Sequence, residues 1–335
     1  MFTYVMNDPE KRKRTVLPPV IIAQMDNDHI TAIDQILGTS QVLSTSSVTT
    51  YHEAIKLRNR LRIDTAAKIL LDNMASTPEV SVIVAGSDGK LEKGPFLDRD
   101  YSPLELIIIC CEAQLGTHLR DQLLLLADQG ILPATDNRIE VKVLAGSEKI
   151  SGYEGNTHRA WPDRLINVRK VFGRNEVYDQ AISQVQSEWK EEGDVRKSVR
   201  NYLSQFMKTC ETGGSRGRKH FDTTTGEIFF DPQSYVLGLK YGPIRALQVF
   251  STMHELNKGI QGKIESNTSD KIAILFPCNS EVIESYQMAL RIYHWQQYRA
   301  KLGENAEIKL QPYELRKIVD PIYNFISKHH SPPHP

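Results

Sequence analysis

Apolar residues recur at helical spacing between residues 50 and 75, and this stretch predicts one long helix. The spaced positions are Ile55, Leu57, Leu61, Ile63, Ala67, Ile69, Leu70 and Met74. Two continuous apolar runs follow, "VSVIVA" from residue 80 and "LIIICC" from residue 106. Uncharged runs of this length are typical of buried strands.

Two further elements complete the pattern of the first half. Residues 112–130 return to helical spacing, with Gly130 as the expected end of a helix. In the next apolar segment Ile139, Val141 and Val143 alternate with charged residues. This alternation predicts a third strand with one buried and one wet face.

Helical patterns dominate from residue 153 onward. The segments predicted as helices are 161–173, 175–214 with a break near Gly193, 243–260, 280–303 and 310–330. We therefore expect an N-terminal extension over 1–49 with a short helix at 28–37. A small α/β domain over 50–152 and an all-helical domain over 153–330 would follow it.

Composition narrows the possible partners. Lys plus Arg and Asp plus Glu both number 41, so the overall charge gives no reason to expect a nucleic-acid partner. No apolar run approaches the length of about 18 residues that indicates a membrane span. The 4 cysteines form neither a disulfide framework nor a CxxC pattern, so we expect buried thiols in a reducing, cytoplasmic compartment. The first residues lack the apolar core of a signal peptide, so any secretion would have to use a route that needs no signal peptide.

The loop between the two apolar runs carries the candidate chemistry. It begins "GSDGKLE" at Gly86 and ends "YSPLE" at Glu105, with Asp98 and Asp100 between these segments. A glycine lets the backbone approach a phosphate group, and a serine with the amides after it can donate to phosphate oxygens. The segment is too short for a P-loop, and Leu91 stands where that motif requires Ser or Thr.

These segments, in their order along the chain, resemble the nucleotidyltransferase superfamily of DNA polymerase β. The similar branch contains the nitrogen-regulatory protein uridylyltransferase and related signal-transduction nucleotidyltransferases. In that branch a Gly-Ser turn ends the first strand, and alternate carboxylates begin the second. Residues 86–92 and 101–105 follow this pattern, with Lys90 in place of an arginine and Pro103 in place of the first carboxylate.

Two segments of the second half extend the resemblance over most of residues 50–325. Arg169 and Gly173 match an Arg-x-x-x-Gly helix break of the branch. The segment 240–247, "KYGPIRAL", is similar to its Gly-Pro-Gly-Gly-Leu-Arg-Asp segment without two of the glycines. The matching arginine is Arg245.

The resemblance implies a nucleotidyltransferase fold in the α/β domain and a helical substrate-binding domain after it. It also implies transfer of a nucleoside monophosphate from a nucleoside triphosphate, with Mg²⁺, to a protein or small acceptor. Carboxylates at alternate strand positions share a face and can hold the two metal ions that stabilise the transferring phosphoryl group.

The candidate site residues fall into three overlapping sets, in which Asp98 and Asp100, outside the expected strand, would supply the carboxylate that Pro103 replaces. The catalytic set is Glu105, Asp100 and Asp98; the metal ligands are Glu105, Asp100 and Glu140; the nucleotide contacts are Gly86, Ser87, Asp88, Lys90 and Arg245.

Alternatives stay open at several of these positions. Asp98 and Asp100 are also ordinary turn residues, Glu140 could be an exposed strand residue paired with a lysine, and Lys90 could be a surface lysine. Pro103 cannot bind a metal through its side chain. It favours a second hypothesis, in which a catalytically silent domain senses a nucleotide or binds a protein. A third hypothesis is a helical adaptor against which the α/β domain only packs.

Overall fold

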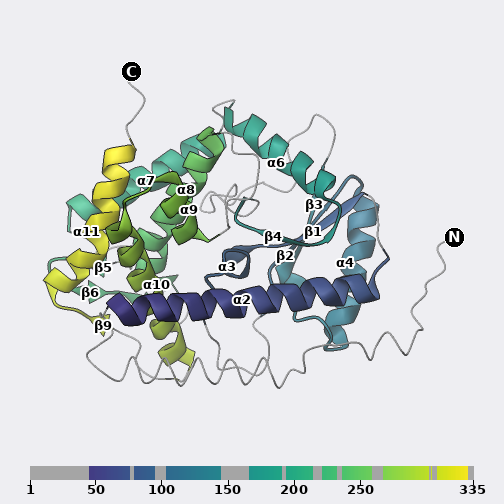
Figure 1. The fold of residues 1–335 in the computed structure, drawn as a ribbon, viewed down its shortest axis with the longest axis horizontal. Helices are drawn as coiled ribbons and strands as arrows, with labels where there is room; N and C mark the ends of the chain where they lie inside the picture. The colour runs from purple at the N-terminus through teal and green to yellow at the C-terminus, as the bar shows by residue number, and fades with distance from the viewer. Residues whose placement is uncertain are drawn as a thin grey trace. The chain divides into compact units, whose positions relative to one another are not determined.

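The computed structural model describes residues 45–75, 79–94, 103–144, 166–190, 194–213, 221–231, 236–258, 267–301, 303 and 308–330 (Figure 1). The predicted helix at 28–37 and the Asp98 and Asp100 positions lie outside these ranges. The chain forms two compact units. The first comprises 1–30, 56–155 and 167–187, and the second comprises 31–55, 156–166 and 188–335. The sequence suggested three consecutive segments, with boundaries near residues 49 and 152.

A mixed sheet forms the centre of the first unit. Its strands are β1 (Val80–Val84), β2 (Leu106–Cys110), β3 (Ile139–Val143) and β4 (Arg169–Gly173), in the order β3-β2-β1-β4. β1 is antiparallel to β2 and to β4, whereas β2 and β3 are parallel. The parallel pair is joined by α4 (Ala113–Asp128) and the short 3-10 helix η2 (Asp136–Arg138). The three strands and two helices predicted for this region are confirmed.

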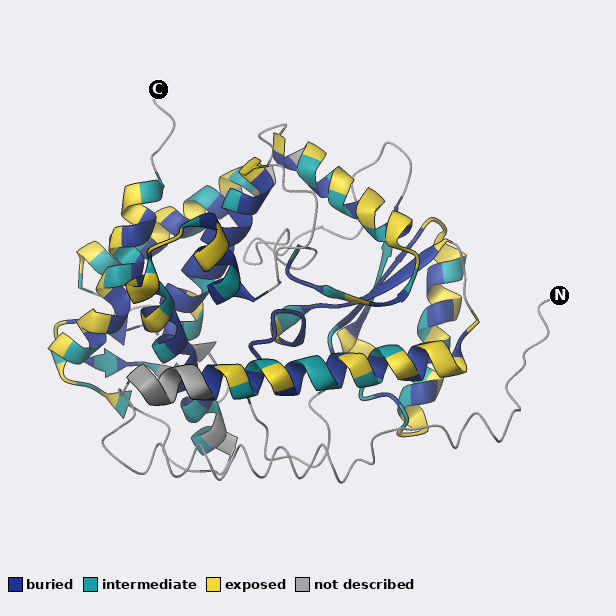
Figure 2. Cartoon of the chain, viewed as in Figure 1, coloured by how far each residue is buried: buried dark blue, intermediate teal, exposed yellow. Residues whose placement is uncertain are grey.

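One face of the sheet packs on α2 (Thr45–Asn73) and α4, the two helices beside it in Figure 1. Alternate residues of the strands meet apolar residues of both helices in one cluster. Its members include Val82, Val84, Leu106, Ile108, Ile63, Ala66, Leu70, Leu119 and Leu123. β1 and β2 are buried on both faces, which explains their uninterrupted apolar sequences (Figure 2). α4 ends as predicted, because Gly130 just beyond it adopts φ +67°.

The predicted helix over 161–173 is wrong where the structure describes it. Residues 169–173 form β4, which pairs with β1 through Val82↔Phe172 and Val84↔Arg169. Val171 and Phe172 favour a strand and are both buried in the core cluster. Pairing with β1 outweighed a helical pattern that was weak over so few residues. The expected helix break at Gly173 is wrong as well, because a strand ends at this glycine, whereas the helix predicted from residue 175 is present as α6 (Asn175–Lys190).

The second unit is mainly helical. Its helices are α7 (Asp194–Glu211), the π-helical turn η3 (Lys240–Ile244), α8 (Arg245–Lys258), α9 (Thr268–Leu275), α10 (Ser280–Lys301) and α11 (Pro312–His329). The expectation of an all-helical domain is wrong in detail, because two small sheets also occur. They are formed by β5 (Phe221–Asp222), β6 (Glu227–Ile228) and β9 (Ile308–Lys309), and by β7 (Phe230–Asp231) and β8 (Val236–Leu237).

The expectation of four buried thiols is correct only for Cys110. Cys111 and Cys278 are exposed and Cys210 is half-buried; all four are unpaired thiols. Cys111 follows the last residue of β2, so it lies beyond the strand that is buried on both faces. Of the helices in the described ranges, none combines the length and apolar character needed to cross a membrane.

Candidate active site

Two of the predicted carboxylates share one face of the sheet. In the parallel pair Leu106 lies opposite Ile139 and Ile107 opposite Glu140. The Ala85 amide donates to the Glu105 carbonyl at 2.7 Å, which continues the β1–β2 pairing one residue beyond the strands. Because side chains alternate along extended backbone, Glu105 and Glu140 both lie on the face opposite the α2–α4 cluster.

Gly86 brings the predicted phosphate turn against Glu105. Its φ is +66°, a conformation that favours glycine. A Cβ added to Gly86 would lie 2.1 Å from Oε2 and 3.0 Å from Cδ of Glu105. The Glu105 side chain therefore occupies the space that a side chain at position 86 would need.

Gly86 is also the first residue of α3 (Gly86–Gly89), a single helical turn. Ser87 is exposed, as a phosphate donor would be, whereas Lys90 is only 6% exposed. Lys90 is thus not a surface lysine, which was the alternative to a phosphate contact. Gly89 has a packing role that the sequence did not predict, because a Cβ there would lie 2.4 Å from the Val84 carbonyl oxygen.

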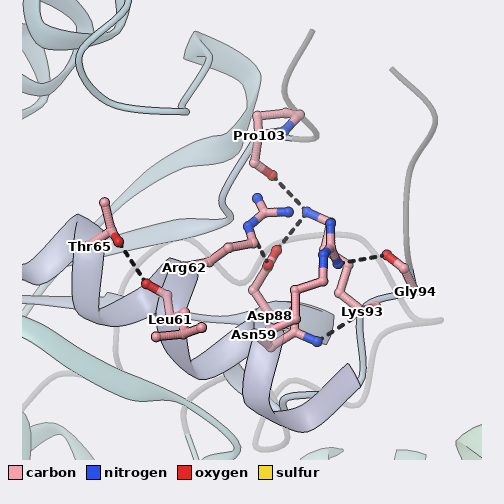
Figure 3. A network of polar contacts seen from close by, with 9 residues as sticks. Asn59, Leu61, Arg62, Thr65, Asp88, Lys93, Gly94 and Pro103 are labelled. Atoms are coloured by element: carbon pink, nitrogen blue, oxygen red, sulfur yellow. Dashed lines mark hydrogen bonds and ion pairs between the residues drawn. The ribbon is translucent and has the colours of Figure 1, made fainter. Parts of the chain in front are cut away.

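Asp88 is a member of a buried ionic cluster (Figure 3). The ammonium of Lys93 donates to Asp88 Oδ2 at 2.6 Å, and Nε of Arg62 lies 3.6 Å from Asp88 Oδ1. Two neighbours on α2 tie the loop backbone to the helix. Arg58 donates to the Gly94 carbonyl at 3.1 Å and Asn59 donates to the Lys93 carbonyl at 3.0 Å.

The charges in this cluster shift one another's protonation. Burial raises the pKa of Asp88, but the nearby Arg62 and Lys93 together lower it by more. The pKa of this carboxyl group therefore lies below its usual range. Burial lowers the pKa of Lys93 to about 8, with Arg62 and Arg58 acting in the same direction against the attraction of Asp88. Asp88, predicted as a nucleotide contact, is therefore engaged in ion pairs that position the loop.

Lys93 also contacts the position where the resemblance expects a carboxylate. Its ammonium donates to the Pro103 carbonyl oxygen at 3.1 Å. A cation held by one carboxylate and one carbonyl thus lies beside residue 103, two residues before Glu105.

The Mg²⁺ ion expected from the sequence would need carboxylate ligands from this face of the sheet. Glu105 and Glu140 offer the hard oxygen ligands that Mg²⁺ prefers, and they project from adjacent strand segments on one face. Glu140 Oε2 lies 3.6 Å from Nζ of Lys142, the lysine pairing given above as its alternative. Within the described ranges, no three His, Cys, Asp or Glu side chains come together as a metal site. Two carboxylates therefore fit the ion as a partial ligand set.

The remaining predicted residues are not among the described residues of the first unit. Asp98 and Asp100 lie outside the described ranges. Arg245 belongs to the second unit, where it begins α8 and its guanidinium donates to Gln248 at 3.5 Å.

Sequence reasoning missed Lys93, Arg58, Asn59 and Arg62. The signal for three of them was present, because Arg58, Asn59 and Arg62 occupy the face of α2 that also buries Ile55 and Ile63. Polar residues on the core face of a helix indicate buried partners. Lys93 had no such signal, since it lies in a loop rich in charge.

Comparison with known proteins adds no family assignment: no protein-family model matches the chain, and no curated protein matches it.

Proposed function

We propose that the first unit is a nucleotidyltransferase domain that uses Mg²⁺ and a nucleoside triphosphate to transfer a nucleoside monophosphate to a protein or small acceptor. The observation that carries the proposal is the placement of Glu105 and Glu140 on one face of a small mixed sheet, with the Gly86 turn against Glu105. A turn that can donate to phosphate oxygens and a pair of carboxylates that can bind a metal ion are the two parts that this reaction requires.

Each residue has a defined role in the proposed reaction. Gly86 and Ser87 would receive the phosphates, and Glu105 with Glu140 would hold Mg²⁺, with Asp98 or Asp100 as further ligands. The bound metal would stabilise the charge on the transferring phosphoryl group. Asp88 and Lys93 would hold the turn in position through their ion pair, without contacting the nucleotide.

Transfer can be measured without knowing the acceptor. The protein is incubated with each of the four labelled nucleoside triphosphates, with Mg²⁺ or Mn²⁺ and a cell lysate that supplies acceptors. The proposal expects label on an acceptor with the wild-type protein and at least about a tenfold loss with Glu105→Ala, because a metal ligand is lost. Equal labelling by the two proteins would refute it.

A catalytically silent binding module is the second candidate function. It is favoured by Pro103 and by the ammonium of Lys93 at its carbonyl, since a fixed cation beside residue 103 reduces the need for a metal ion there. Calorimetry distinguishes the two candidates. A silent sensor binds the triphosphate equally well in EDTA and in Mg²⁺, whereas the enzyme binds it more tightly with the metal.

A further inference from the structure

Two histidines of the second unit pack against the same phenylalanine ring. His254 of α8 lies 4.9 Å and His329 of α11 lies 5.0 Å from Phe276, the residue that follows α9, between ring centroids. Phe250 of α8 lies 4.4 Å from His254, and Phe325 of α11 lies 5.0 Å from His329. The last turn of α11 is therefore held against α8 and α9 by an aromatic contact that contains two titratable rings.

The position of His254 favours a neutral ring. Its Nε2 atom is buried and has no hydrogen-bond partner among the described residues. Protonation turns both ring nitrogens into donors and adds a full charge. A buried donor that finds no acceptor is destabilising, and more so when it is charged. The contact between α8, α9 and α11 therefore depends on a neutral His254.

The charged groups that act on these rings are basic. Glu255, next to His254 in the chain, is buried in an ion pair with Lys271 of α9. Glu281 and Glu284, near the start of α10, are exposed. A proton on either ring therefore meets further positive charge, and no carboxylate of the described residues acts on it. The basic groups that act on His254, on His329 and on the adjacent His330 are Lys258 of α8, Lys328 of α11, Arg200 of α7 and the two histidines of α11 themselves.

The face of the Phe276 ring offers little compensation for these charges. The ammonium of Lys258 already lies 5.8 Å from the centroid of this ring. A cation–π contact stabilises one cation over an aromatic ring, whereas further cations at the same ring repel the first.

We propose that protonation of His254 and His329 separates the last turn of α11 from α8 and α9, so that this contact acts as a pH switch within the second unit. The inference does not depend on the proposed transferase, because it concerns no residue of the candidate active site.

The switch would act in mild acid. The pKa of His254 is lowered from 6.5 to about 4, chiefly by burial, and burial also lowers the pKa of His329. In the separated state both rings are in water and have the ordinary value. Protons therefore favour separation as the pH falls from 6.5 towards 4. Opening one helical turn exposes much less apolar surface than unfolding the unit, so the turn should open at a higher pH than the unit unfolds.

Hydrogen exchange of the full-length chain, followed by mass spectrometry, tests the proposal. Exchange is measured at pH 7.5 and at pH 5.5, and protection factors are corrected for the pH dependence of intrinsic exchange. We expect the peptide over 322–330 to lose about fivefold in protection at pH 5.5, because the separated state takes up the proton that the closed state excludes. Peptides from α10 should lose less than about twofold.

Two variants keep an aromatic ring and remove the titratable group, His254→Phe and His329→Phe. Each should retain more protection over 322–330 at pH 5.5 than the wild type, and the double variant should retain nearly all of it. His118→Gln, on the exposed face of α4, is the control and should behave as the wild type does.

Three results would overturn the switch. They are unchanged protection over 322–330 at pH 5.5, an equal loss in all peptides of the second unit, and an undiminished loss in the variants. The second result would mean that acid destabilises the unit as a whole. The comparison between peptides of the wild-type protein decides the question even where a variant fails to fold.

Discussion

Lys93 joins two parts of the loop between β1 and β2 through its ammonium, and it contacts helix α2 through its backbone carbonyl. It donates to Asp88 in the turn and to the carbonyl of Pro103 before β2, and its own carbonyl accepts from Asn59 of α2. Lys93 is 7% exposed and Asp88 is 2% exposed, so the pair is screened little by solvent. Removing one partner of such a buried pair destabilises the fold, because the other charge is left buried without compensation.

Lys93→Met should therefore destabilise the protein by about 3 kcal/mol, because the Asp88 carboxylate would remain buried with Arg62 as a more distant partner. Urea unfolding measures the change. Lys68→Met on the exposed face of α2 is the matched control and should change the unfolding free energy by less than about 0.5 kcal/mol. Similar stabilities of the two variants would contradict the ionic cluster.

Strand β4 depends on the glycine at its end. Gly173 has φ +81°, and a Cβ there would lie 2.0 Å from the Val80 carbonyl oxygen of β1. Gly130 after α4 has a similar φ of +67°, but nothing lies within 4 Å of its Cβ position. Substitutions at the two glycines therefore distinguish the effect of backbone strain from the effect of close packing.

Gly130→Ala should cost about 1 kcal/mol of stability, the strain of a left-handed alanine. Gly173→Ala should cost at least about 3 kcal/mol, because the strain is joined by a clash that forces β4 away from β1. Thermal unfolding of both variants measures the difference. If Gly173→Ala were no worse than Gly130→Ala, the pairing of β4 with β1 would be wrong.

An aromatic cluster containing histidines joins α8, α9 and α11 in the second unit. The ring of His254 lies 4.4 Å from Phe250 and 4.9 Å from Phe276 between centroids, and His329 lies 5.0 Å from Phe276. The pKa of His254 is lowered to about 4, chiefly by burial and further by the nearby His329, Lys258 and His330.

This shift predicts loss of stability in acid. Between the ordinary His pKa of 6.5 and the folded value of about 4, the unfolded chain binds a proton that the folded chain does not, so stability falls as the pH falls. For a half-buried ring the loss should be about 1 kcal/mol. His254→Phe, which keeps an aromatic ring, should flatten the dependence of Tm on pH over this range. The exposed His118→Gln should leave it unchanged, and an equally steep profile for His254→Phe would contradict the assignment.

Strong periodic patterns predicted most of the fold. The continuous apolar runs, the alternation at 139–143 and the long helical stretches reappear as β1, β2, β3, α2, α4, α10 and α11. Residues 169–173 were predicted as a helix because so short a segment shows no clear period, and its partner β1 is far away in sequence. Helix α9 and the two-residue strands were missed for the same reason, since few positions define them.

The candidate site was predictable in its residue types but not in its contacts. The sequence pointed to Gly86, Glu105 and Glu140, and strand alternation explains why two of them share a face. That Glu105 lies on Gly86, and that Asp88 is bound by Lys93 and Arg62, depends on how the loop returns to the sheet and to α2. Sequence spacing does not encode such tertiary contacts.

The position of the label that reaches the acceptor tests the proposed nucleotidyl transfer most directly. Nucleotidyl transfer breaks the bond between the α- and β-phosphates, so the α-phosphorus stays with the acceptor and pyrophosphate leaves. With Mg²⁺ and an acceptor source, we expect incorporation from α-labelled triphosphate, none from γ-labelled triphosphate, and loss of incorporation in Glu105→Ala and Glu140→Ala. Transfer of the γ-label, or no transfer of the α-label above the level of these two variants, would contradict it.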